Sequence, residues 1–246
     1  MKITHWVASY DAPRWPVVDS WMNVQTPDNA RLNFVRSTQP HNKDLAEWNK
    51  VIVDFLARGD DWLFITAQDV IFCKEALMRL MSWDKKIISA LVFMRNPPNI
   101  PHIWKAYSDG GANIFVNRIN DTRQWLMNHA NWMAVFGSFA MEPKPDDALV
   151  PVDFTSTSCT LIHRSVLEAL EPPYFLMDSD EGGGEDRRLF QNALAKGFQP
   201  YVDRSCIVGH LMGDVPASAP DFITWTEVSV LKNTGQKEET QDTTTS

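Results

Sequence analysis

The sequence predicts an α/β fold in which helices flank a mostly parallel central sheet. Apolar segments of strand length alternate with segments of helical periodicity through the first half of the chain. "DWLFIT" (61–66) and "KIISALVFM" (86–94) are apolar runs typical of strands buried on both faces. The 246 residues, 44% of them hydrophobic, suffice for a large core. We expect one domain over residues 1–233 and a disordered polar tail over 234–246.

The expected elements follow one another as βα units. Strands are predicted at 3–10, 30–37, 61–66, 86–94, 153–163 and 200–210, and helices at 44–59, 74–83, 164–170 and 186–197. The helix at 44–59 is the most regular, because its apolar residues recur on one face and Gly59 can end it. A connection rich in Trp and Pro separates the first two strands. Residues 96–151 lack the alternation, which favours loops and antiparallel hairpins.

Composition excludes several classes of protein. With a net charge of -8 and no clustered Lys and Arg, the chain is unsuited to coating nucleic acid. Its apolar runs are shorter than the roughly 20 residues that cross a bilayer, so we expect no transmembrane segment and a cytoplasmic location. The three cysteines, Cys73, Cys159 and Cys206, are widely spaced in apolar runs, which predicts small buried residues.

Three groups of polar residues stand where ligand sites form in α/β proteins. Asp69 follows the strand at 61–66, at the carboxyl end where open sheets bind ligands, although a turn or helix cap would look the same. Glu185 and Asp186 open a helix whose free amides favour ionised carboxylates, although an ordinary helix start is also acidic. His210 ends the last strand. Together these groups can supply ligands for a divalent cation and a carboxylate that acts as a general base.

Three segments, in order, resemble the GT-A-fold glycosyltransferases of the large family-2 type. "DDWLFITAQDVIFCKEALMRLMSWDKKIISALVFMR" is similar to their strand, Asp-x-Asp motif, helix and second strand. "VDFTSTSCTLIHRSVLEALEPPYF" resembles their acceptor-side strand and helix, and "GGGEDRRLFQNALAKGFQPYVDRSCIVGH" resembles their Gly-Gly-Glu-Asp helix and closing strand. The resemblance covers roughly residues 45–95 and 150–212, and it implies a GT-A-like nucleotide-diphospho-sugar transferase fold.

The resemblance implies a role for each matching residue. Asp69 matches the last Asp of the Asp-x-Asp motif and His210 a metal-binding His, so both are expected to bind the Mn²⁺ or Mg²⁺ that bridges the donor diphosphate. Asp186 is the expected general base, and Glu185 is expected to orient a sugar. The remaining expected contacts are Ser9, Tyr10, Asp11, Asn49 and Gln68 with the nucleotide-sugar donor, and Gly183 and Gly184 with the substrate.

The implied function is transfer of a sugar from a nucleotide-sugar donor to a hydroxyl of a carbohydrate or other acceptor, with inversion and metal dependence. One departure opens an alternative: Ala67 stands where the family has its first Asp, and the neighbouring Gln68 is neutral. A sugar- or nucleotide-binding protein without turnover would tolerate this loss. Another metal-using α/β enzyme, such as a phosphoryl-transfer enzyme, is a third possibility, but the sequence contains no Walker-type loop or dinucleotide fingerprint.

Overall fold

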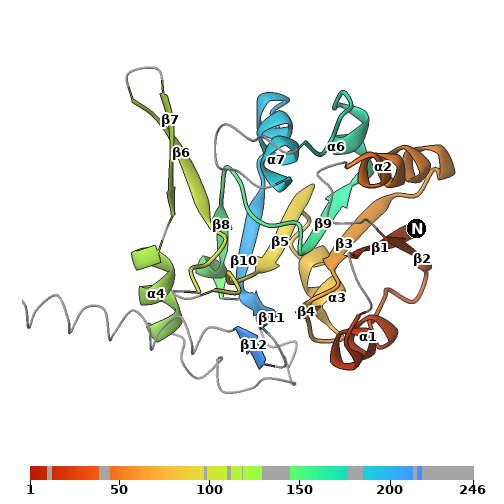
Figure 1. The fold of residues 1–246 in the computed structure, drawn as a ribbon, viewed down its shortest axis with the longest axis horizontal. Coiled ribbons are helices and arrows are strands. Elements are labelled where there is room, and N and C mark those ends of the chain that lie inside the picture. Colours follow the sequence, from red (N-terminus) through yellow and green to blue (C-terminus); the bar gives the residue numbers. More distant parts are fainter. Residues whose placement is uncertain are drawn as a thin grey trace, which may run out of the picture.

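A seven-stranded sheet flanked by helices forms the centre of the molecule (Figure 1). The computed structural model describes residues 1–9, 13–38, 45–96, 99–109, 112–117, 119–128, 145–176, 185–212 and 215–217. The strands lie in the order β2 (Arg31–Thr38), β1 (Lys2–Ser9), β3 (Trp62–Ala67), β9 (Cys159–His163), β5 (Ile87–Leu91), β10 (Tyr201–Ile207) and β8 (Leu149–Pro151). The predicted α/β class is confirmed.

The sheet is mixed, and most of its strands run one way. β1 is parallel to β2 and β3, and β10 is parallel to β5, whereas β9 runs antiparallel to both of its neighbours and β8 antiparallel to β10. Only β9 and β8 therefore oppose the common direction. The start of β9 consequently lies at the same edge of the sheet as the ends of β1 and β3.

Helices cover both faces of the sheet (Figure 1). One face carries α2 (Ala46–Arg58), α6 (Arg164–Glu168) and α7 (Asp186–Ala195), and the other carries α1 (Trp15–Met22) and α3 (Ala76–Met81). Side chains of β1 alternate between the two layers: Trp6 packs with Phe55 and Phe190, and Val7 packs with Val17 and Leu77. Each layer thus has its own buried apolar cluster.

The predicted helix at 44–59 is observed as α2, Ala46–Arg58. Trp48, Ile52 and Phe55 are buried on its inner face, as the periodicity indicates. Gly59 ends the helix in the left-handed region, with φ of 70°, and its N–H donates to the carbonyl of Leu56 at 3.2 Å.

Two α-helices of the described residues were not predicted. α1 lies in the Trp- and Pro-rich connection, where Pro16 is tolerated because it occupies the first turn. The second is α4 (Ile119–Asn128), within the segment expected to hold loops and hairpins. The hairpin expectation is confirmed there by the antiparallel pair β6 (Trp104–Asp109) and β7 (Ala112–Asn117), and the short helix η1 (Asp146–Ala148) precedes β8.

The predicted last strand, 200–210, is divided in two. β10 ends at Ile207, and β11 (Gly209–Met212) joins β4 (Val70–Ile71) and β12 (Val215–Ala217) in a separate antiparallel sheet. In this sheet His210 pairs with Val70, the residue after Asp69. The break in the strand is therefore what brings His210 next to Asp69.

Further expectations concern the cysteines, membrane-spanning helices and the polar tail. Cys159 and Cys206 are buried and Cys73 is half-buried, and all three are free thiols. Among the helices that the structure describes, none is long and apolar enough to cross a membrane. The predicted tail, 234–246, lies outside the described residues.

Candidate functional site

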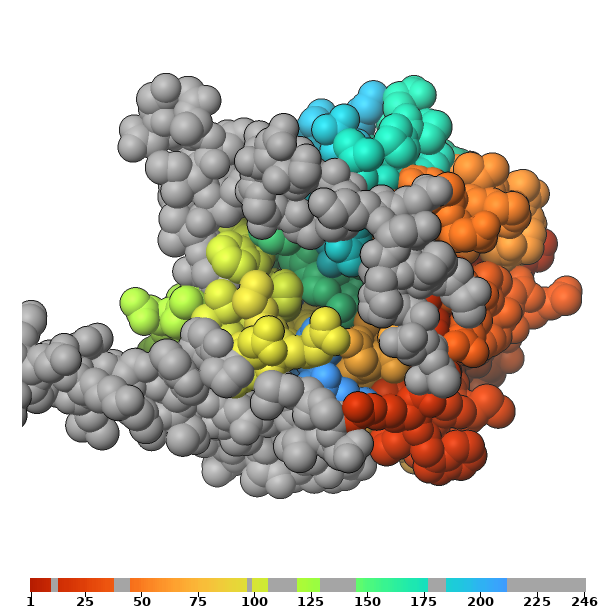
Figure 2. Space-filling view, in the orientation of Figure 1, coloured from red at the N-terminus to blue at the C-terminus, as the bar shows by residue number. Residues whose placement is uncertain are grey.

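A pocket of about 380 Å³ opens at the edge of the sheet where β3 ends and β9 begins. Figure 2 looks onto the face where the yellow, green, cyan and blue parts of the chain come together. Five residues predicted for the site line the pocket: Gln68, Asp69, Glu185, Asp186 and His210. These side chains come from three distant parts of the sequence, so the fold assembles the pocket and no single motif contains it.

Asp69 and His210 lie side by side in one wall of the pocket. The His210 Nε2 atom lies 3.4 Å from the Asp69 Oδ2 atom, and the backbone N–H of Leu211 donates to the Asp69 carbonyl at 2.7 Å. The His210 Nδ1 atom lies 2.9 Å from the carbonyl oxygen of Phe93. Because a carbonyl only accepts hydrogen bonds, Nδ1 donates to Phe93. Nε2 donates to Asp69 when the ring is protonated, and it can offer a lone pair to a cation when the ring is neutral.

Asp69 is held in its ionised form. Burial alone would raise the pKa of its carboxyl group, but the hydrogen bond and charge of His210, together with the charge of Arg95, lower the pKa below its ordinary value. The Arg95 Nη1 atom lies 3.0 Å from Asp69 Oδ2. The carboxylate is therefore charged at neutral pH and already has a cationic partner.

Asp186 stands at the first turn of α7, on another wall of the pocket. Its Oδ2 accepts the backbone N–H of Thr157 at 3.2 Å, and its Oδ1 accepts the Thr157 hydroxyl. Burial and the charge of Glu185 raise the pKa of Asp186 to about 7, against the hydrogen bonds from Thr157 and Ser156 that lower it. A carboxyl group with a pKa near neutrality is suited to accept a proton in a reaction at neutral pH.

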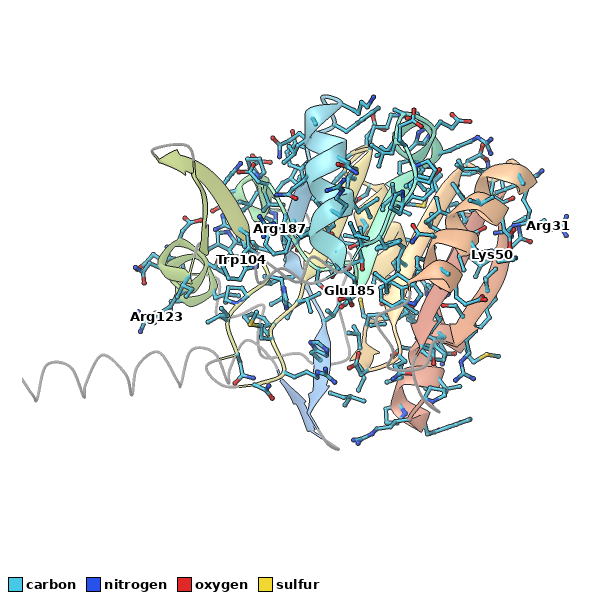
Figure 3. The ribbon with its side chains drawn as sticks, turned by 45° about the horizontal axis from the view of Figure 1, so that its top comes forward. Arg31, Lys50, Trp104, Arg123, Glu185 and Arg187 are labelled. Atoms are coloured by element: carbon cyan, nitrogen blue, oxygen red, sulfur yellow. The ribbon has the colours of Figure 1, made fainter. Side chains whose placement is uncertain are left out.

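Glu185 precedes Asp186 at the foot of α7. Figure 3 places it near the middle of the molecule, with Arg187 further along the same helix. Glu185 lines the pocket and is half-buried. Its charge is also one of the causes that keep Asp186 from ionising at low pH.

Ser9 does not line the pocket itself but hydrogen-bonds to Gln68, which does. Ser9 is fully buried, and its hydroxyl donates to the Gln68 side-chain oxygen at 2.7 Å. Arg36 donates to the same Ser9 hydroxyl at 3.0 Å, and the Gln68 backbone N–H donates to the Ala8 carbonyl at 3.1 Å. Gln68 lines the pocket directly, whereas Ser9 positions it.

Asn49 does not line the pocket. Its side-chain oxygen accepts the backbone N–H groups of Tyr174 and Phe175, at 2.6 and 3.0 Å, and its amide nitrogen donates to the Leu45 and Phe175 carbonyls, each at 3.0 Å. Three of these four bonds fasten α2 to Tyr174 and Phe175 and so give Asn49 a structural role, and the donor contact expected of Asn49 stays a prediction. Four other predicted site residues, Tyr10, Asp11, Gly183 and Gly184, lie outside the described residues.

Several residues that line the pocket were not predicted, among them three with polar side chains near Asp69, Asp186 or His210. Thr157 belongs to the polar run that precedes β9, and its position would follow from the sequence only if β9 were known to be antiparallel. Arg95 is the first polar side chain after the apolar run 86–94, which is the same signal that selected Asp69. His102 is the third, and burial followed by the charge of His210 lowers its pKa to about 4. It is therefore neutral at neutral pH.

Comparisons with known proteins agree with the fold. No family model matches the chain, and no curated protein matches it. Among solved structures, A197 from STIV is similar with a TM-score of 0.55 and 14% sequence identity, over 90% of this chain and 92% of that chain. At this identity the likeness shows a shared fold, which does not by itself establish a shared function.

Proposed function

We propose that the protein is a family-2-like glycosyltransferase of GT-A fold that moves a sugar from a nucleotide-sugar donor to an acceptor hydroxyl, with inversion. The observation that carries the proposal is the convergence of Asp69, His210 and Asp186 on one pocket. Asp69 and His210 supply a site for the diphosphate end of the donor, and Asp186 supplies a base for the acceptor. The cytoplasmic location predicted from the sequence stays a prediction.

Asp186 is the proposed general base, and its neighbours position it in the pocket. When ionised, Asp186 can accept the proton of an acceptor hydroxyl as that oxygen attacks the anomeric carbon of the donor sugar. The backbone N–H and hydroxyl of Thr157 hold the carboxylate in place. Glu185, beside it in the pocket, is placed to accept hydrogen bonds from sugar hydroxyls.

Asp69 and His210 fit a divalent cation of the Mn²⁺ or Mg²⁺ type. Oδ2 of Asp69 and Nε2 of His210 face the same space, and both are donor atoms that these ions accept. Among the described residues, no cluster of three or more His, Cys, Asp or Glu side chains can hold a metal. Further ligands would therefore include the donor's phosphate oxygens. A cation bound there would neutralise the negative charge that builds on the departing nucleoside diphosphate.

A second candidate function is binding of a sugar or nucleotide without turnover. The ion pair between Arg95 and Asp69 favours it, because it neutralises the carboxylate expected to attract the metal. Ala67 also leaves the motif without its first acid.

The test is release of nucleoside diphosphate from a panel of UDP- and GDP-sugars with Mn²⁺. The parent protein should release nucleoside diphosphate from at least one of these donors, slowly as hydrolysis or faster when an acceptor is added. Asp186→Asn keeps the shape but removes the proton acceptor, so acceptor-dependent release should fall about 10²-fold or more while donor affinity stays nearly unchanged. Donor binding by the parent without any release would favour the second candidate. Equal rates in parent and variant would remove Asp186 from the mechanism.

A further inference from the structure

Arg95 contacts the same oxygen atom of Asp69 that the expected cation would need. Its Nη1 lies 3.0 Å from Oδ2 of Asp69, which is the oxygen that His210 Nε2 faces at 3.4 Å. A divalent ion held by Asp69 and His210 would need this same oxygen. Two like charges at one oxygen repel each other, so the guanidinium and the ion compete for Asp69.

The Arg95 side chain is free to move, although its backbone is held. The side chain is 57% exposed. Its backbone carbonyl and that of Met94 accept bonds from the buried Asn99 side-chain amide, both at 3.0 Å, and the Met94 N–H donates to Ile100 at 2.9 Å. The guanidinium can therefore leave Asp69 by side-chain rotation while the backbone of Met94 and Arg95 stays in place.

We propose that the Arg95 guanidinium pairs with Asp69 until a diphosphate enters the pocket and then moves to the phosphate oxygens, which leaves Oδ2 of Asp69 to the cation that enters with the diphosphate. The diphosphate rests on the proposed function. Guanidinium groups bind phosphate oxygens through paired hydrogen bonds, which gives Arg95 a partner to exchange for Asp69. Because Ala67 stands in place of the first acid of the motif, a single Arg suffices to neutralise the motif before a ligand binds.

The experiment measures two affinities that should change in opposite directions in Arg95→Gln. Mn²⁺ alone is titrated by electron paramagnetic resonance, and a preformed complex of Mn²⁺ and pyrophosphate is titrated by calorimetry. Without the competing cation, Arg95→Gln should bind Mn²⁺ alone about tenfold more tightly than the parent, a difference of about 1.4 kcal/mol. The variant should bind the pyrophosphate complex about tenfold more weakly, because a phosphate contact is lost.

Three variants serve as controls. Arg31→Gln makes the same change of charge at the start of β2, far from Glu185 in Figure 3, and should match the parent in both titrations. Arg95→Lys keeps the charge without the paired donors, so Mn²⁺ alone should bind as in the parent. Adding Asp69→Ala to Arg95→Gln should abolish the gain in Mn²⁺ affinity, which places the ion at Asp69.

The proposal is overturned if Arg95→Gln binds Mn²⁺ alone no more tightly than the parent, including the case in which neither binds it. It is also overturned if the pyrophosphate complex binds equally to both proteins. Neither titration uses a sugar or a transfer reaction. Opposite shifts without turnover of any nucleotide sugar would therefore support the role of Arg95 and count against the glycosyltransferase. Turnover with unchanged Mn²⁺ affinity would count against Arg95 alone.

Discussion

Burial, together with two neighbours that have opposite effects, sets the pKa of the Asp186 carboxyl group. The Glu185 charge adds to the effect of burial and raises its pKa, whereas the Thr157 backbone N–H and hydroxyl lower it, and the resulting pKa is about 7. At this pKa both protonation states are populated near neutral pH. A substitution of either neighbour should therefore change how the reaction rate and the free energy of unfolding depend on pH.

Thr157→Val removes the hydroxyl that donates to Asp186 and keeps the backbone N–H. The pKa of Asp186 should rise further, because the ionised form loses one of its hydrogen bonds. Activity that needs ionised Asp186 rises with pH through this pKa, so the rising limb of the rate profile should move to higher pH. The measurement is the initial rate of nucleoside diphosphate release from about pH 5.5 to about pH 8.5. A fall of the same factor at every pH would show that Thr157 acts without changing this pKa.

The same pKa makes a prediction about stability. The folded-state pKa of Asp186, about 7, lies above the ordinary 3.8, so the folded state binds the proton more tightly than the unfolded state. The contribution of Asp186 to the free energy of unfolding is therefore most favourable below about pH 4 and is lost as the pH rises to about 7. Asp186→Asn does not titrate, so its stability relative to the parent should increase across this range and then level off.

Urea denaturation at a series of pH values measures this difference. Glu185→Gln is the matched control, because it removes the neighbouring charge and leaves Asp186 able to titrate at a lower pH. Its stability relative to the parent should rise over only part of the same range. A constant difference between Asp186→Asn and the parent from pH 4 to pH 8 would contradict the raised pKa.

At the scale of elements, short strands decide which residues meet. Asp69 and His210 were selected separately, each because it follows an apolar strand. Their contact depends on β4, a strand of two residues, pairing with β11. Periodicity cannot reveal a two-residue strand or its partner, because such a strand has no pattern of its own. The residues were therefore predictable, whereas the pairing that joins them was not.

Helix α2 supports the site by holding the chain before α7. Asn49→Ala would leave the backbone N–H groups of Tyr174 and Phe175 without their side-chain acceptor, and each buried polar group left unpaired costs about 1–3 kcal/mol. The free energy of unfolding should therefore fall by roughly that amount or more in urea denaturation. Lys50→Ala, at the exposed neighbouring position, should leave the midpoint nearly unchanged. If Asn49→Ala has the stability of the parent and loses donor affinity, Asn49 contacts the donor after all.

At the scale of the whole molecule, the site occupies one edge of the sheet. Strands β1 and β3 end there, β9 begins there, and α7 and the β4–β11 pair complete the walls. The alternation of strands and helices predicted this edge as the ligand site, because parallel strands place their carboxyl ends together. The reversed direction of β9 was not predictable from its apolar residues, which read the same in both directions. That direction is what places Thr157 beside Asp186.

The proposed function requires that Asp69 and His210 bind a divalent ion together with a nucleotide sugar. The most direct measurement is calorimetric titration of the nucleotide sugar that gives the largest thermal shift in a panel, into parent and Asp69→Ala proteins, each with Mn²⁺ and with chelator. The parent should bind at least about tenfold more tightly with Mn²⁺ than with chelator, and Asp69→Ala should bind weakly and equally in both. Equal affinity of the parent with Mn²⁺ and with chelator would contradict the claim.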